Sequence, residues 1–337
     1  MIEYIIKRVL LFIPTMIAIT IIAFGISRLA PGDPAAIKAG VASEGSQNQN
    51  SVINAKSLEE WRKQMHLDKP ILTQYGLWLM DILQLDFGKS FKDSRPVLDK
   101  IVERFPLTII MNLVAVVLAY IIAVPIGVYS ATHPNTTLDK ILSMFTFAMY
   151  SLPTVWTATL AITFLCSTEF LYLFPTSGFR SDDFSMLSFP EQVIDITWHL
   201  LLPMLIYTYG SFAFISRQMR SAMLETVRQD YIRTARAKGL SEKVVIMKHA
   251  FRNSLIPIIT LLAGILPQLI GGSVIVESKF SIPGMGKLSF EALNDRDYPM
   301  IMAIFTISGV LTLAGILLSD ILYSIADPRI AYTKKSS

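Results

Sequence analysis

The stretch SIPGMGKLS, residues 281–289, comes nearest in this sequence to a phosphate-binding loop. Such a loop needs the pattern G-x-x-x-x-G-K-[ST], in which backbone N–H groups hold phosphates and a hydroxyl binds magnesium. Ser281 stands where the first glycine is required, and Leu288 stands where the hydroxyl is required. The pattern therefore predicts a tight Gly-Pro turn followed by Lys287, and not a nucleotide site.

Histidine and cysteine give no sign of metal or redox chemistry. The histidines are His66, His133, His199 and His249, and no two of them have the short helical spacing of paired zinc ligands. The single cysteine, Cys166, excludes an internal disulfide and a Cys-rich metal site. We therefore expect no catalytic residue, no metal site and no cofactor bound by this chain, which would then not be an enzyme.

The densest group of charges is a basic segment, residues 217–253, with nine cations and three acids. The cations are Arg217, Arg220, Arg228, Arg233, Arg236, Lys238, Lys243, Lys248 and Arg252. No interleaved aromatic residues or recognition motif accompany them, which argues against nucleic acid binding. Two explanations stay open: contact with anionic lipid at the cytoplasmic face of a membrane, or docking of another protein.

Apolar residues within the basic segment recur at helical spacing. A first stripe ends before Gly239, which is a typical helix stop, and consists of Leu224, Val227, Tyr231 and Ala235. Ser241 stands at an N-cap position, with Glu242 in the following turn. A second stripe consists of Val244, Met247 and Phe251. The pattern predicts a helix, a glycine-marked turn and a second short helix.

The elements around this segment are apolar. Hydrophobic residues make up 52% of the 337 residues, charged residues make up 17%, and the mean hydropathy is +0.49. About 20 apolar residues are needed to cross a bilayer as a helix. Six stretches free of Asp, Glu, Lys and Arg reach that length: Val9–Ser27, Phe105–Leu138, Ile141–Thr168, Ile196–Ser216, Asn253–Val276 and Tyr298–Ser319. The sequence thus predicts an all-α polytopic membrane protein with six transmembrane helices, the first retained and not cleaved as a signal peptide.

The distribution of Lys and Arg predicts the orientation. Six evenly spaced spans place Lys7, Arg8, the basic segment and the tail cations Lys334 and Lys335 on one side, which is the cytoplasm. Both termini would then be cytoplasmic. Residues 169–195, on the other side, carry one cation and five acids.

The sequence suggests three parts. Residues 1–30 are the N-terminus and first span, residues 31–104 form a small helical extracytoplasmic insert, and residues 105–337 form a five-helix core that includes the loop 217–253. Ser57 and Pro70 are expected to begin helices of the insert. Residues 41–56 are polar and predict a flexible excursion.

No acid or base lies near the middle of any predicted span. Ion-coupled transporters usually need such residues as proton or cation relays, so an ion-coupled secondary transporter is the less favoured alternative. Pro125, Pro153, Pro203 and Gly264 interrupt spans where hinges or ordinary kinks would both fit.

Motifs along nearly the whole chain resemble one family. TARAKGLSEKVVIMKHAFRN looks like the cytoplasmic loop of ATP-binding-cassette importer permeases, in the dipeptide, oligopeptide and nickel branch. The motifs RLAPGDPA, LDFGKSF, PVLDKIVERFPLT, VESKFSIPGMGKLSFEALNDRDYPM and DPRI occur in the matching order. FPTSGFRSDDF and WHLLLPML also resemble the microcin-type peptide permeases of that branch.

The resemblance implies a type I ABC importer permease fold and a coupling helix. Ala237, Lys238, Gly239, Leu240 and Ser241 match the part that docks in a groove of the ATPase subunit. When the loop is aligned on Gly239, the Glu-Ala-Ala positions of the wider superfamily are occupied by Arg233, Thr234 and Ala235, and its Pro position by Arg252. This departs from the superfamily but agrees with the peptide branch, and it puts in doubt any ion pair that the missing Glu would supply. Arg236, which follows Ala235, belongs to the same predicted coupling loop.

The resemblance also implies partners and a substrate class. A homologous second permease subunit, two ATPase subunits that hold ATP and magnesium, and an extracytoplasmic substrate-binding protein would complete the importer. The cargo would be peptides or similar small solutes, with nickel complexes as an alternative, moved across the bacterial inner membrane.

Overall fold

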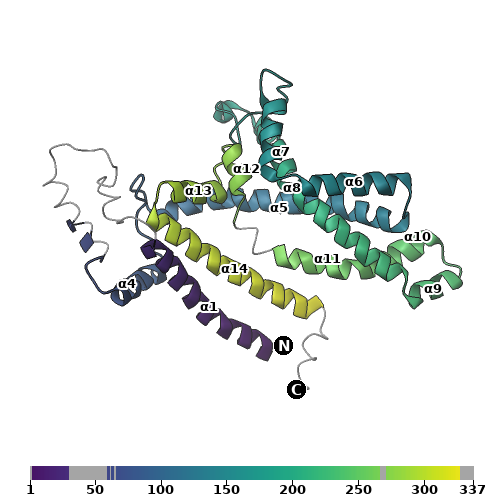
Figure 1. Ribbon diagram of the computed structural model, residues 1–337, viewed down its shortest axis with the longest axis horizontal. Helices are drawn as coiled ribbons and strands as arrows, with labels where there is room; N and C mark the ends of the chain where they lie inside the picture. Colours follow the sequence, from purple (N-terminus) through teal and green to yellow (C-terminus); the bar gives the residue numbers. More distant parts are fainter. Residues whose placement is uncertain (1, 30–58, 61, 64–65, 266–270, 327–337) are drawn as a thin grey trace. The chain divides into compact units, whose positions relative to one another are not determined.

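The computed structural model describes residues 2–29, 59–60, 62–63, 66–265 and 271–326 (Figure 1). Within these ranges the regular secondary structure is helical and no strand forms, apart from an isolated bridge between Lys89 and Pro96. The all-α expectation is therefore confirmed. Ser57 and the polar stretch 41–56 lie outside the described residues, so the insert 31–104 as a whole stays a prediction.

The chain forms two compact units, Met1–Phe105 with Leu288–Leu317 and Pro106–Lys287 with Leu318–Ser337. In the first unit, helix α1 (Ile2–Leu29) lies beside the first part of α14 (Tyr298–Ala326) (Figure 1). The two helices approach closely at Gly309, where a Cβ would lie 2.6 Å from Cγ2 of Ile19. Glycine at this contact allows the two apolar helices to pack closely, as small residues do within membranes.

A short helix, α4 (Ile71–Leu83), packs on α1 in the first unit. Pro70 is its N-cap residue, as the sequence predicted, because a fixed φ and a missing N–H suit the first turn of a helix. The Tyr75 hydroxyl lies 2.8 Å from the Thr20 hydroxyl, and the Tyr75 and Trp78 rings contact Phe24. Aromatic side chains thus fix α4 against the C-terminal half of α1.

A loop before α5 (Val97–Thr132) holds the start of α14 in the same unit. The Ser90 hydroxyl and the Phe91 N–H donate hydrogen bonds to the buried Asp297 carboxylate. Lys92 forms an ion pair with Asp295 at 2.8 Å. These contacts satisfy a carboxylate that would be costly to bury alone.

The second unit is built around the long helix α8 (Phe189–Val227). Helices α6 (Thr137–Ser151), α7 (Thr154–Ala161) and α11 (Phe251–Ile265) pack against it. Its core includes Met111 and Ala119 of α5, Ile206 and Phe212 of α8, and Phe280, which follows α12 (Val274–Lys279). Gly127 of α5 is packed so tightly on α8 that a Cβ would lie 2.7 Å from the Ser216 carbonyl oxygen.

The third apolar stretch, Ile141–Thr168, is not one straight helix. Helix α6 ends at Ser151, α7 begins at Thr154 and continues into a π-helical turn, Ile162–Cys166, and the two parts meet at an angle of 97°. Leu152 has an extended conformation with ψ 124°, because the proline ring of Pro153 disfavours helical backbone in the residue before it. The interruption that the sequence indicated at Pro153 is confirmed, and whether the two parts form one span stays a prediction.

Among the described residues, four helices are long and apolar enough to cross a membrane, and the bent pair could be a fifth span. The four segments are Leu10–Leu29, Val97–Thr132, Phe189–Val227 and Tyr298–Leu318. The predicted fifth span, Asn253–Val276, includes residues 266–270, which lie outside the described part. The count of six spans therefore stays a prediction, as does the cytoplasmic tail with Lys334 and Lys335.

Candidate functional site

The basic segment folds into a projecting turn at the end of the second unit. Helix α8 ends at Val227, and Gln229 caps α9 (Asp230–Ala237). The short α10 (Glu242–Val244) follows, then a π-helical turn, Val245–Ala250, which leads into α11. Residues 236–244 are all exposed, and we call them the tip.

Gly239 gives the tip its sharp change of direction. Its φ is +77°, in the left-handed region that costs other residues about 1–2 kcal/mol. The Gly239 N–H donates to the Arg236 carbonyl at 2.9 Å, and the Leu240 N–H donates to the Ala235 carbonyl at 3.4 Å. This pair of bonds is a Schellman motif, which satisfies the last carbonyls of α9. The predicted helix stop at Gly239 is confirmed.

An ion pair closes the turn from the other side. The Arg236 guanidinium donates two hydrogen bonds to the Glu242 carboxylate, from Nε at 3.1 Å and from Nη2 at 2.6 Å. These bonds, together with the charge of the guanidinium, hold the pKa of Glu242 below its usual value. Bidentate geometry of this kind fixes orientation as well as distance. The tip is therefore a preformed shape, held by its own residues.

The inner side of the turn is anchored in an apolar cluster. Ile232 of α9 and Val245 of the π-turn are completely buried, together with Ala235 and Ala250. The same cluster contains Ala131 of α5, Met219 and Met223 of α8, and Ile258 of α11. The tip thus rests on residues of α5, α8 and α11, so that a displacement of the tip would act directly on these helices.

The structure shows which residues of the predicted stripes face inward. Ala235 of the first stripe is buried, but Tyr231 is 44% exposed and Ile232 is buried beside it, because the helix breaks at Arg228–Gln229 and restarts in a new register. Val244 and Met247 are likewise exposed while Val245 is buried. The π-turn carries more residues per turn than the 3.6 that the stripe assumed.

The structure brings most of the sequence-predicted site residues together in or beside the tip. Arg236, Ala237, Lys238, Gly239, Leu240 and Ser241 lie in the tip, and Arg233, Thr234 and Ala235 lie in the preceding turns of α9. Ser241 is the N-cap residue of α10, as predicted, although its side chain makes no capping hydrogen bond. Arg252 is exposed in the first turn of α11, beyond the π-turn.

An ion pair with a buried carboxylate, near the same end of the unit, was not predicted. Asp139 of α6 is 3% exposed and accepts hydrogen bonds from the Asn135 N–H at 3.0 Å and from Arg220 of α8 at 3.2 Å. The sequence reading counted Arg220 only as one of nine basic-segment cations. Because the partners are far apart in the chain, spacing alone could not have paired them.

A second feature that sequence reasoning missed lies just before the stretch 281–289 and packs against it. The Glu277 carboxylate is 1% exposed and accepts hydrogen bonds from the N–H groups of Ser273 at 3.3 Å and Lys287 at 2.9 Å. A Cβ on Gly272 or Gly284 would lie under 3.0 Å from this side chain. The glycines are therefore needed for close packing around a carboxylate of the chain itself, which could have been suspected from an acid just before a Gly-x-Gly turn.

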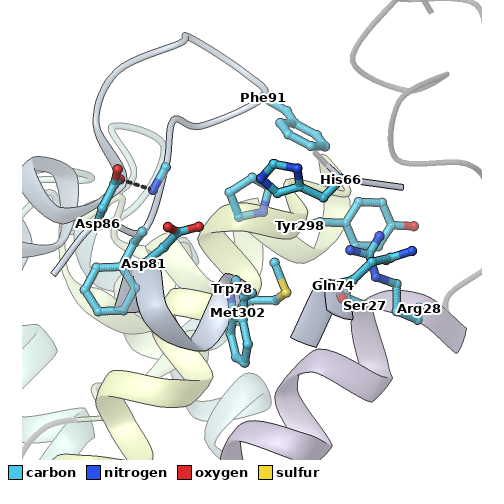
Figure 2. A pocket seen from close by; sticks show the side chains of 13 residues that line it. Ser27, Arg28, His66, Gln74, Trp78, Asp81, Asp86, Phe91, Tyr298 and Met302 are labelled. Atoms are coloured by element: carbon cyan, nitrogen blue, oxygen red, sulfur yellow. Dashed lines mark hydrogen bonds between the residues drawn. The ribbon is translucent and has the colours of Figure 1, made fainter. Parts of the chain in front are cut away.

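The first unit contains a cavity of about 210 Å³ beside α4 (Figure 2). Asp81 and Asp86 lie on one side of it and Arg28 lies on the other, with His66, Trp78 and Tyr298 between them. Among the described residues, no group of three His, Cys, Asp or Glu side chains is placed to hold a metal ion. The tip, which combines exposure, charge and rigid support, is therefore the stronger candidate site.

Two family models match the sequence. Residues 1–112 match the N-terminal region of membrane components of binding-protein-dependent transport systems. Residues 123–332 match the inner membrane component of binding-protein-dependent transport systems. Together the two matches cover nearly all of the chain, including the tip and the turn around Glu277.

Curated relatives match over their whole length. The oligopeptide transport system permease protein AppB of Bacillus subtilis is 39% identical over 333 residues, which cover 98% of this chain and 100% of the relative. The inner membrane ABC transporter permease protein YejB of Escherichia coli O157:H7 is 34% identical over 361 aligned positions, with 98% of both chains covered. The chain therefore belongs to the family of inner membrane permease components of binding-protein-dependent transport systems.

Proposed function

We infer that this chain is the permease subunit of an ATP-driven importer that moves peptides across the inner membrane. Full-length similarity to an oligopeptide permease supports the substrate class. The single structural observation that carries the coupling role is the tip, an exposed and internally braced turn that rests on a buried cluster.

The tip is the proposed contact with a separate ATPase subunit. The Schellman turn at Gly239 and the Arg236–Glu242 pair give it a fixed shape that a groove in a partner can match. The partner would bind ATP and magnesium, and closure of two such subunits would move the tip. Ile232 and Val245 would pass that movement to α5, α8 and α11, because a close-packed cluster transmits displacement.

The remaining partners follow from the same proposal. A homologous second permease subunit would complete the pathway, and an extracytoplasmic binding protein would deliver the peptide. The basic segment and both termini would be cytoplasmic, in accord with the excess of Lys and Arg. Such a chain carries out no covalent chemistry, because its task is to convert movement of the partner into movement of its own helices.

Co-purification of tagged variants tests the coupling role. Gly239→Asp places a side chain and a negative charge on the tip, in a conformation that disfavours Cβ atoms. We expect this variant to reach the membrane but to lose its ATPase subunit and ATP-dependent peptide uptake.

Gly88→Asp is the matched control, because Gly88 has a φ of +74° and the same open surroundings but lies in the loop before α5. It should keep the ATPase subunit and uptake. If Gly239→Asp retains both, or if both variants lose the ATPase equally, the tip is not the docking element. Uptake of labelled oligopeptide, with a nickel salt as competitor, separates peptide transport from transport of nickel complexes.

A further inference from the structure

Helix α4 is apolar but too short to cross a membrane. It has 13 residues, Ile71–Leu83, of which only Asp81 is charged, whereas a span needs about 20. An apolar helix of this length in a membrane protein is usually either buried in the core or placed at the membrane interface. None of its residues is buried, which rules out a place in the core.

The contacts of α4 with α1 set its depth. Arg28 marks the charged end of the first span, and Phe24 and Thr20 precede it by 4 and 8 residues in the same helix. At a rise of about 1.5 Å per residue, these positions lie about 6 Å and about 12 Å below Arg28. Trp78 contacts Phe24, and Tyr75 contacts both Phe24 and Thr20. The aromatic side of α4 therefore reaches below the level of the charged end of α1.

The outward side of α4 is apolar. Leu72, Met80 and Leu83 share this side, and they are 82%, 61% and 77% exposed. At the depth along α1 that Tyr75 and Trp78 reach, such side chains would contact acyl chains and not water. The exposed isoleucines of α1 at the same levels, Ile22 and Ile26, require the same surroundings.

The polar side of α4 points elsewhere. Gln74 and Asp81 are two turns apart and both line the cavity beside Arg28 (Figure 2). Charged residues also flank the helix, with Asp68 and Lys69 before it and Asp86 and Lys89 after it. This arrangement is typical of helices that lie in the plane of the membrane–water interface. Such helices carry Trp and Tyr on one side, apolar residues on another and charges at both ends.

We propose that α4 is an interfacial helix, embedded in the lipid leaflet at the C-terminal end of α1, with Leu72, Met80 and Leu83 in contact with acyl chains. This is the outer leaflet in the orientation proposed above. The proposal gives this helix of the expected extracytoplasmic insert a place in the lipid leaflet. It depends on insertion of the chain in a membrane and not on the identity of the cargo.

Spin labels can measure this depth directly. Cys166 is replaced by Ala, and single cysteines at positions 72, 80 and 83 are labelled with a nitroxide. The chain, assembled with its partner subunits, is reconstituted in phosphatidylethanolamine–phosphatidylglycerol vesicles. Power saturation then compares collision with oxygen, which concentrates in lipid, and with a water-soluble nickel chelate. Ile22→Cys is the lipid-facing reference, and Lys89→Cys is the water-facing reference.

We expect labels at all three positions to behave like the label at position 22 and to collide more often with oxygen than with the nickel chelate. Labels that resemble the one at Lys89 would place α4 in water and overturn the proposal. Low access to both reagents would show that a protein partner covers α4, and this also overturns it. If Cys166→Ala does not fold, the three cysteines can be introduced into the chain that keeps Cys166, because the buried Cys166 is protected from the label. The chain without an introduced cysteine, treated with the same label, then gives the background signal.

Discussion

At the residue scale, the contact between Arg236 and Glu242 decides how rigid the tip is. Arg236→Gln removes both hydrogen bonds to the carboxylate. Because an exposed ion pair contributes about 0.5–1 kcal/mol, we expect about twofold to fivefold faster amide exchange over residues 236–244. Hydrogen exchange followed by mass spectrometry checks this.

The pH dependence of the same pair has a definite sign. The pKa of Glu242 is held below its ordinary value, so the pair contributes fully above that ordinary pKa and is lost as pH falls through the lowered one. The difference between Arg236→Gln and the unchanged chain should therefore vanish in acid. Arg233→Gln is the control, because the Arg233 side chain is 74% exposed and its contact with Asp230 is loose, at a distance of 3.5 Å. If Arg233→Gln loosens the tip as much as Arg236→Gln, the bidentate pair is not what braces it.

Individual residues also show where sequence reasoning succeeds. Gly239 could be identified as a helix stop because its requirement for positive φ is local. The Asp139–Arg220 pair could not be identified from spacing, since it depends on how two segments 81 residues apart meet. A local backbone requirement can be read from the residue itself, whereas a contact between distant residues becomes visible only in the fold.

At the element scale, the close packing of α5 on α8 gives a prediction. Gly127→Ala adds a Cβ under 3 Å from the Met219 side chain and the Ser216 carbonyl, and the backbone of α8 cannot easily move away. We expect a loss of about 1–3 kcal/mol in stability, seen as a lower melting temperature in detergent.

Gly210→Ala supplies the matched comparison within α8. Gly210 has no atom within 4 Å of the position a Cβ would take, so the added methyl group meets open space. This variant should melt at or above the temperature of the unchanged chain, because alanine favours a helix more than glycine does. Equal destabilisation by both variants would contradict the packing argument.

The elements also show why helix boundaries were harder to predict than helices. Pro153 indicated an interruption, but only the extended conformation of Leu152 and the packing of α7 produce a bend of 97°. The second stripe, Val244, Met247 and Phe251, assumed a period of 3.6 residues, which the π-turn does not follow. Apolar length predicts that a helix exists, whereas its register depends on local hydrogen bonding that composition does not reveal.

At the scale of the whole molecule, the distribution of charge predicts topology. With Cys166→Ala as background, Lys243→Cys should react with a membrane-impermeant maleimide only after cells are permeabilised. Asp182→Cys, in the acidic loop 169–195, should react in intact cells. The prediction follows from the excess of Lys and Arg that cytoplasmic loops carry. Labelling of Lys243→Cys in intact cells would reverse the orientation and remove the tip from any cytoplasmic partner.

The π-turn between the tip and α11 has a consequence for how movement could spread through the molecule. A π-turn holds about one residue more than an α-helical turn. If Val245–Ala250 rewound into regular α-helix, α11 would rotate about its axis by about 100° relative to the tip, the angle that one residue occupies in a helix. The π-turn thus holds one extra residue at the base of the tip. Its rewinding would convert a displacement of the tip into a rotation of α11 about its axis.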